Sequence, residues 1–212
     1  MRKLLTAAFA ATVLLAGEAQ ACARLGFTPF YLEGRARTPD GEWRSTWMEA
    51  DDTKVRFEQA HPATPWGRLA VAGDTKEGHA EVFPVAADAK RIPDDARVAW
   101  KTSLADGLAE LQVTTGVFDW WPGRRDGPKL RVNDIPCQML TETDDTRGNT
   151  ICLADGNVPV LVKDPAGRPL FEATRVIMRP ADPARFSAPS TYPRTTRKPK
   201  YLWNWGCDRS AP

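Results

Sequence analysis

The chain has 212 residues, with 29 basic and 27 acidic side chains, so its net charge at neutral pH is only +2. This length is sufficient for one domain with a full hydrophobic core, and so small a net charge gives no overall field that would capture nucleic acid or an anionic surface. Nucleic-acid binding is therefore not expected.

The N-terminal segment predicts export. Two basic residues precede an apolar run, 4–16, that is too short to span a bilayer, and the Ala-Gln-Ala motif ending at residue 21 offers a small-x-small cleavage site. We expect residues 1–21 to be a signal peptide and the mature chain to be periplasmic, without a transmembrane segment. A lipid anchor on Cys22 is the alternative, but Ala19 stands where a leucine usually precedes a lipidated cysteine.

From residue 27 to residue 85 the sequence alternates between apolar and polar residues and is broken by turn residues, as in Pro39-Asp40-Gly41. Val55 and Phe57 share one face of the run 53–60, and charged residues share the other, which predicts a half-buried antiparallel strand. The first half is therefore expected to be a β-meander with strands near 30–38, 42–49, 53–60, 67–72 and 79–85.

A change of pattern between residues 93 and 112 predicts the one convincing helix of the mature chain. Leu104, Leu108 and Leu111 recur at helical spacing, and Ser103 can cap the first turn. Gly107 lowers the helix propensity of this segment.

Four cysteines allow three disulfide pairings: Cys22, Cys137, Cys152 and Cys207. Cys137 and Cys152 lie in two β-rich runs joined by a polar turn, and a register centred between Asp144 and Asp145 places them opposite each other, which favours a disulfide across this hairpin. The remaining pair, Cys22 and Cys207, would tie the two ends together. A zinc site is the competing interpretation, but the sequence has no Cys-x-x-Cys motif and its two histidines are distant from every cysteine.

Further strands are expected at 158–163 and 170–179, followed by an irregular segment beyond Phe186. We divide the mature chain into a domain, 22–190, and a basic, aromatic extension, 191–212, that Cys207 would hold to the body. The basic residues of the extension are explained equally well by a solvated tail and by a phosphate-binding patch: Arg194, Arg197, Lys198 and Lys200.

Several segments of the second half resemble a known family: VNDIPC (132–137), ICL (151–153), NVPV (157–160), EAT (172–174) and DPARF (182–186). They are similar to the closing half of periplasmic proteins related to the lipoprotein carriers LolA and LolB, above all to the DUF4412 domain of uncharacterised function. Asp134 and Asn157 stand where that domain has glycine. The resemblance implies an α+β fold in which a strongly curved antiparallel sheet, an incomplete barrel, packs around a helical plug and encloses an apolar cavity.

Catalysis is not expected. The paired carboxylates at 51–52, 94–95 and 144–145 adjoin predicted turns, where aspartate bonds to the backbone. There is no Gly-x-Ser-x-Gly elbow and no Walker-type loop, and the cysteines are expected to be oxidised. We therefore assign no catalytic residue, cofactor or metal. A copper site that combines His61 and His79 with Met48 or Met139 is a minor alternative to surface histidines.

The aromatic residues offer the best candidate site. Trp43 and Trp47 are four residues apart on one strand and so share a face, which Phe57 of the next strand is expected to join. These residues form either a plain core or, together with Leu104 and Leu108, the lining of a cavity between sheet and helix.

The favoured hypothesis is a monomeric, non-catalytic periplasmic protein that binds an apolar ligand, such as a lipid or the acyl chain of an envelope lipoprotein. The alternative hypothesis is a cell-envelope interaction module in which the sheet edge or the basic segment 194–200 contacts a partner protein.

Overall fold

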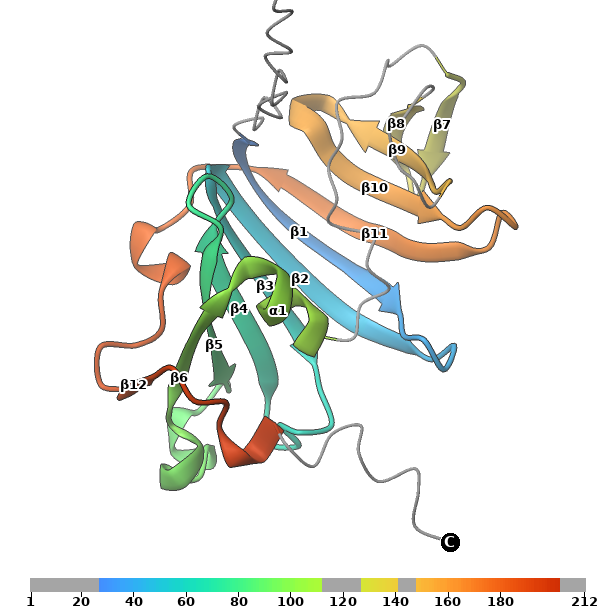
Figure 1. The fold of residues 1–212 in the computed structure, drawn as a ribbon. Helices are drawn as coiled ribbons and strands as arrows, with labels where there is room; N and C mark the ends of the chain where they lie inside the picture. The colour runs from blue at the N-terminus through green and yellow to red at the C-terminus, as the bar shows by residue number, and fades with distance from the viewer. Residues whose placement is uncertain (1–26, 112–126, 141–147, 203–212) are drawn as a thin grey trace, which may run out of the picture.

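The computed structural model describes residues 27–111, 127–140 and 148–202, and these residues form one large open β-sheet (Figure 1). The order of strands across the sheet is β12-β6-β5-β4-β3-β2-β1-β11-β10-β9-β8-β7. Neighbouring strands are antiparallel except β12 and β6, which are parallel. The strands are β1 (Phe27–Arg37), β2 (Trp43–Asp52), β3 (Lys54–Ala60), β4 (Arg68–Asp74), β5 (His79–Val85), β6 (Ala99–Ser103), β7 (Lys129–Val132), β8 (Ile135–Met139), β9 (Thr150–Ala154), β10 (Val158–Lys163), β11 (Pro169–Met178) and β12 (Arg194–Thr195).

Helical structure is sparse in the described residues. One α-helix, α1, runs from Leu104 to Glu110, and the 3-10 turns are η1 (Ala89–Arg91), η2 (Asp94–Ala96), η3 (Asp155–Asn157), η4 (Pro183–Phe186) and η5 (Lys200–Leu202). The expected α+β architecture, dominated by one sheet, is thus confirmed, and β1 to β5 form the expected meander. The short strand β6 was not predicted; it lies directly before α1, within the segment 93–112 where the change of pattern was interpreted as helical.

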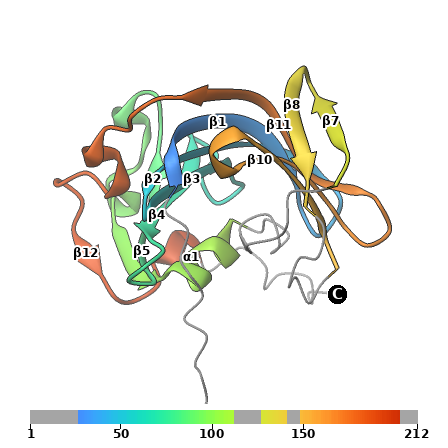
Figure 2. The same cartoon turned by 90° about the horizontal axis from the view of Figure 1, so that it is seen from above.

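Helix α1 begins where the sequence predicts. The Ser103 hydroxyl accepts a hydrogen bond from the backbone N–H of Asp106 at 3.0 Å and so caps the first turn. Gly107 faces the sheet: a Cβ atom there would lie 3.0 Å from a methyl group of Val71 and 3.2 Å from one of Val82. Glycine therefore lets the helix approach β4 and β5 closely. Figure 2 shows α1 on the concave side of the bent sheet, and its main contacts are with β4, β5 and β6.

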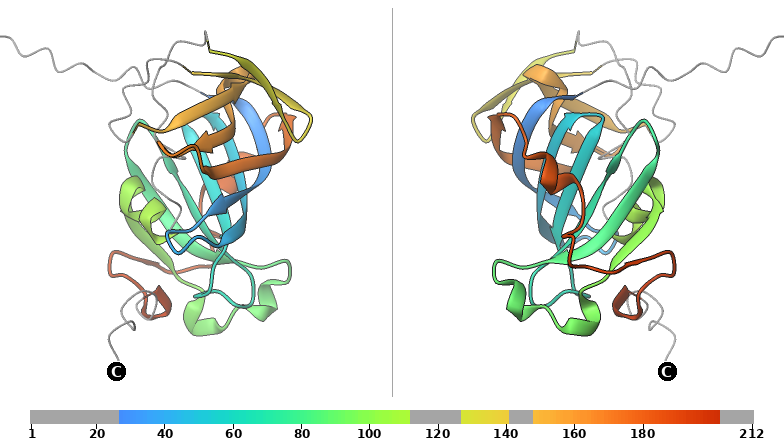
Figure 3. Two further views of the ribbon diagram at one scale, coloured as in Figure 1. Left: turned by 90° about the vertical axis from the view of Figure 1, so that its right-hand side faces the viewer. Right: turned by 90° about the vertical axis from the view of Figure 1, so that its left-hand side faces the viewer.

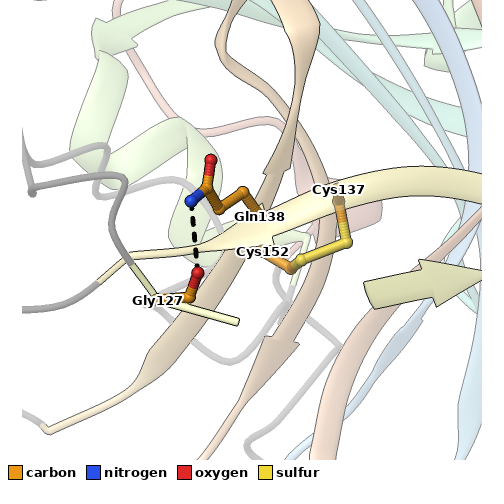
Figure 4. The surroundings of a disulfide bond; sticks show 4 residues. All are labelled: Gly127, Cys137, Gln138 and Cys152. Atoms are coloured by element: carbon orange, nitrogen blue, oxygen red, sulfur yellow. Dashed lines mark hydrogen bonds between the residues drawn. A yellow bond between two sulfur atoms is a disulfide. The ribbon is translucent and has the colours of Figure 1, made fainter. Parts of the chain in front are cut away.

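The predicted disulfide between Cys137 and Cys152 is present, joining β8 to β9 with a Cα–Cα distance of 5.5 Å (Figure 4). The predicted register was wrong by two residues, since Cys152 pairs with Met139 and Leu153 pairs with Gln138. Cys137 still reaches Cys152 diagonally, because residues two apart on a strand point to the same face. Cys22, Cys207 and the turn at 144–145 lie outside the described residues.

The concave face of the sheet carries the main hydrophobic core. Its side chains come from both halves of the sheet, from Phe30, Leu32 and Phe57 in the first half to Val160 and Phe171 in the second, and all are at most 1% exposed. Leu202, in the described part of the C-terminal extension, belongs to the same cluster. The extension, as far as it is described, therefore packs with the sheet.

Part of the convex face of the first half is also covered. Residues 179–193, here called the strap, connect β11 to β12 and cross the outside of the sheet, as the right-hand view of Figure 3 shows. Ala188 and Tyr192 of the strap join a second apolar cluster with Ala70, Ala72 and Phe83. The small side chains of Ala70 and Ala72 project from the middle of β4 and leave room for the strap.

Candidate functional site

The structure divides the predicted aromatic cluster between the two faces of the sheet. Met48 pairs with Phe57, and Trp47 pairs with Glu58, so Phe57 lies on the concave face whereas Trp47 lies on the convex face. The expectation that Phe57 joins the two tryptophans was wrong, because Phe57 lies opposite Met48, whose side chain points to the other face from Trp47. Trp43 shares the convex face with Trp47 and is 37% exposed.

Leu104 and Leu108 lie on α1, half-buried, and pack against the core cluster that contains Phe57. The structure therefore brings three of the five proposed cavity-lining residues together on the concave side: Phe57, Leu104 and Leu108. Trp43 and Trp47 belong to a different environment.

That second environment combines aromatic rings with arginines. Each of four rings on the convex face has a guanidinium group over it, at 4.4 to 5.2 Å from the ring centroid. Such cation–π contacts orient a guanidinium and reduce its freedom. The pairs are Arg35 with Trp43, Arg68 with Trp47, Arg56 with Phe83 and Arg179 with Tyr31.

A buried carboxylate, Glu58 on β3, connects two of these arginines, Arg56 and Arg68, with Arg185 of the strap. Its Oε1 atom lies 2.7 Å from Nε of Arg56 and 3.5 Å from Nη2 of Arg185, and its Oε2 atom lies 2.9 Å from Nη1 of Arg68. Glu58 is only 3% exposed and Arg56 only 8%. Burial lowers the pKa of the Arg56 guanidinium from its ordinary value, while the charge of Glu58 opposes that change.

Glu49 forms a second ion pair beside the first. It is 3% exposed, and its carboxylate lies 2.8 Å from Nε of Arg185 and 3.5 Å from Nη2 of Arg179. Arg56 also donates from Nη1 to the backbone carbonyl of Arg185 at 2.5 Å. The two buried carboxylates thus hold the strap against the sheet through Arg179 and Arg185.

The predicted half-buried character of β3 was wrong, because Arg56 and Glu58 are as inaccessible as Val55 and Phe57. No local pattern predicts this burial, since the covering strap lies more than 120 positions further along the chain. One signal was available: Arg185 belongs to the DPARF segment, one of those that carry the family resemblance.

His61 is buried rather than exposed, contrary to the prediction. Its Nδ1 atom accepts a hydrogen bond from the N–H of Ala63 at 3.1 Å, and the backbone of Glu110, at the end of α1, acts on the ring to raise its pKa. Burial, assisted by the positive charge of Arg44, lowers the pKa of His61 to about 4. The imidazole is therefore neutral at physiological pH and links the helix to the end of β3.

The copper alternative finds no support in this arrangement. His79 is exposed at the start of β5, where it pairs with Glu77, whereas His61 follows the last residue of β3 at the opposite end of the strands. Within residues 27–111, 127–140 and 148–202, no three histidine, cysteine or carboxylate side chains gather in a way that would hold a metal ion.

Two of the basic residues of the extension, Arg194 and Lys198, are engaged with the body of the protein. Arg194 pairs with Glu81 at 3.2 Å and donates to backbone carbonyls of the strap, while Lys198 contacts Glu110 at 2.6 Å. In the part of the chain that the structure describes, no helix is long and apolar enough to cross a membrane.

Comparisons with known proteins identify no family for this chain. No protein-family model matches the sequence, and no curated protein matches it significantly.

Proposed function

We propose that this chain is a non-catalytic periplasmic protein that binds an apolar ligand of the acyl-chain class on the concave face of the sheet, next to α1. The observation that carries the proposal is the continuous apolar lining of that face. This lining extends from Phe30 and Phe57 in the first half of the sheet to Val160 and Phe171 in the second. Helix α1 contacts mainly β4, β5 and β6, so it covers only part of that face. Apolar, concave surfaces with few polar groups are the usual environment for such ligands.

Leu104 and Leu108 support this assignment. Both are half-buried on α1 and pack against the concave core, so part of each side chain lies accessible beside that apolar surface. An acyl chain that entered between helix and sheet would bury this area, at about 25 cal/mol per Å² of apolar surface. In this proposal α1 acts as the helical plug that the LolA and LolB resemblance implies.

The test combines native mass spectrometry of protein purified from an exporting host with displacement of a fluorescent fatty acid. We expect a copurified mass and competitive displacement. Leu108→Gln, which preserves helix propensity, should weaken probe binding, whereas Trp43→Gln on the opposite face should leave it unchanged. Bare protein mass together with absence of probe binding would contradict the proposal.

The sheet edge supports a second candidate, an envelope interaction module. Strand β7 ends the described sheet, and three of its four residues are exposed, including Leu130 at 37%. An exposed edge strand can add a strand from another chain. A photo-cross-linker at Leu130 should trap one defined protein if β7 is an interaction edge, whereas a carrier should trap lipid or many lipoproteins.

A further inference from the structure

A pocket on the convex face carries an unbalanced positive charge. It lies between the outer faces of β3 to β5 and the strap and has a volume of about 390 Å³. Its lining contains three arginines and one glutamate, a net charge of +2, together with the rings of Phe83 and Tyr192. Glu49, which pairs with Arg185 at 2.8 Å, and Arg179 lie just beyond the lining, and their opposite charges leave the sum at +2 when both are counted.

The arginines of the pocket are held in place before any ligand arrives. Arg68 stacks on Trp47 at 4.4 Å, and Arg56 stacks on Phe83 at 5.2 Å and donates to the Arg185 carbonyl. All three contact the carboxylate of Glu58, which fixes their separations. A guanidinium has five N–H donors, so a contact with Glu58 through one or two nitrogens leaves further donors on each group.

We propose that this pocket binds a phosphate monoester. A phosphate monoester carries close to two negative charges at neutral pH and so matches the excess of +2, whereas a single carboxylate would neutralise half of it. Its oxygens also suit the paired N–H groups of arginine. Phe83 and Tyr192 supply an apolar wall for the organic part of the ligand. The site lies on the opposite face of the sheet from the acyl-chain site and does not depend on it.

Two sources could present this chemistry, a soluble phosphorylated metabolite or the headgroup of a lipid such as phosphatidic acid. Calorimetric titration with inorganic phosphate and glycerol 3-phosphate, at constant ionic strength and about pH 7.5, tests the first. Flotation with vesicles containing phosphatidic acid tests the second. Binding in either experiment supports the proposal and identifies the source.

Arg68→Gln is the decisive variant because Arg68 is partly exposed and lies on the sheet rather than in the strap. We expect its dissociation constant for glycerol 3-phosphate, or for the vesicles, to rise about tenfold or more, since a charge-assisted contact is lost. Arg68→Lys keeps the positive charge but loses the planar, forked set of N–H donors. Its dissociation constant should therefore lie between those of Arg68→Gln and the unmodified protein.

Arg35→Gln is the matched control. Arg35 also stacks on a tryptophan and pairs with a glutamate, Trp43 and Glu172, but it lies outside the pocket. Its loss should leave phosphate binding unchanged, and circular dichroism with thermal melting should show that both variants fold. The proposal is overturned if the unmodified protein binds neither phosphate ligands nor vesicles beyond the level seen with chloride, or if Arg35→Gln weakens binding as much as Arg68→Gln.

Discussion

At strand β3 both faces of the sheet are buried, but by different means. On the concave face, β3 contributes Val55 and Phe57 to the main apolar core. On the convex face, the same strand contributes Arg56 and Glu58 to an ion network that the strap covers. The comparison teaches that alternation along a strand identifies its two faces but does not say which of them meets water.

The largest expected effect is on the concave face. Replacement of Phe57 by alanine should lower the free energy of unfolding by about 3 to 5 kcal/mol, because it leaves a cavity in a fully buried site. Urea denaturation measures this loss. Trp43→Ala, on the convex face at 37% exposure, should cost about 1 kcal/mol or less. Equal losses for the two variants would show that the faces do not differ as described.

Glu58→Gln should cost roughly 3 kcal/mol, because it removes the carboxylate that compensates a buried Arg56. The control is Glu172→Gln, which breaks the pair with Arg35, a side chain that is 52% exposed, and which should cost about 1 kcal/mol at most. Both values come from the same denaturation experiment. If Glu58→Gln is as mild as Glu172→Gln, solvent reaches the network and the strap does not seal it.

Acid should weaken the link between α1 and β3 through His61. The unfolded chain binds a proton at His61 below about pH 6.5, whereas the folded protein does so only near pH 4, so this contribution to stability is present above pH 6.5 and is lost as the pH falls. We expect about 2 kcal/mol of loss between pH 7 and pH 5.

The measurement is the free energy of unfolding across that pH range, for the unmodified protein and for two variants. His61→Gln should have a flatter pH dependence, while His79→Gln, at an exposed site, should retain the steep one. Identical slopes in all three proteins would contradict a buried, neutral His61.

The smallest expected effect is at the start of α1. Ser103→Ala removes the cap on the N–H of Asp106 and should cost about 1 kcal/mol, whereas Ser103→Asp keeps an acceptor and should cost little. Thermal melting of the two variants distinguishes a loss of the cap from a general effect of substitution. If the two variants melt together below the unmodified protein, the hydroxyl does not act as a cap.

The parts of the fold that depend on local patterns were predictable. The meander, the helix capped by Ser103 and the Cys137–Cys152 disulfide all follow from turns, spacing and residue type within short windows of sequence. Strand β6 was missed because five residues directly before a helix give too little alternation to be separated from it. The two-residue error in the register of the clipped hairpin has a similar origin, since alternation defines faces and leaves even shifts open.

The environment of the site residues could not be predicted from short windows of sequence, because it depends on contacts between residues far apart in the chain. The burial of Arg56 and Glu58 requires Arg185, and the burial of His61 requires the end of α1. Phe57 was assigned to the wrong face relative to Trp47, because the alignment of neighbouring strands depends on the turn that joins them. Leu104 and Leu108 pack against the core cluster that contains Phe57, and their shared helix face follows from their spacing of four residues.

The pairing of β1 with β11 has a consequence for how the chain reaches its native state. Arg35 and Glu172 pair across these strands although 137 positions separate them, so the middle of the sheet closes one of the longest loops in the chain. Closure of long loops is slow, and proteins dominated by such pairs fold in milliseconds to seconds. Until β11 arrives, β1 offers an unpaired edge beside Phe30 and Leu32, which is the kind of strand that recruits other chains. The interval between the synthesis of β1 and the synthesis of β11 is thus when aggregation competes most strongly with folding.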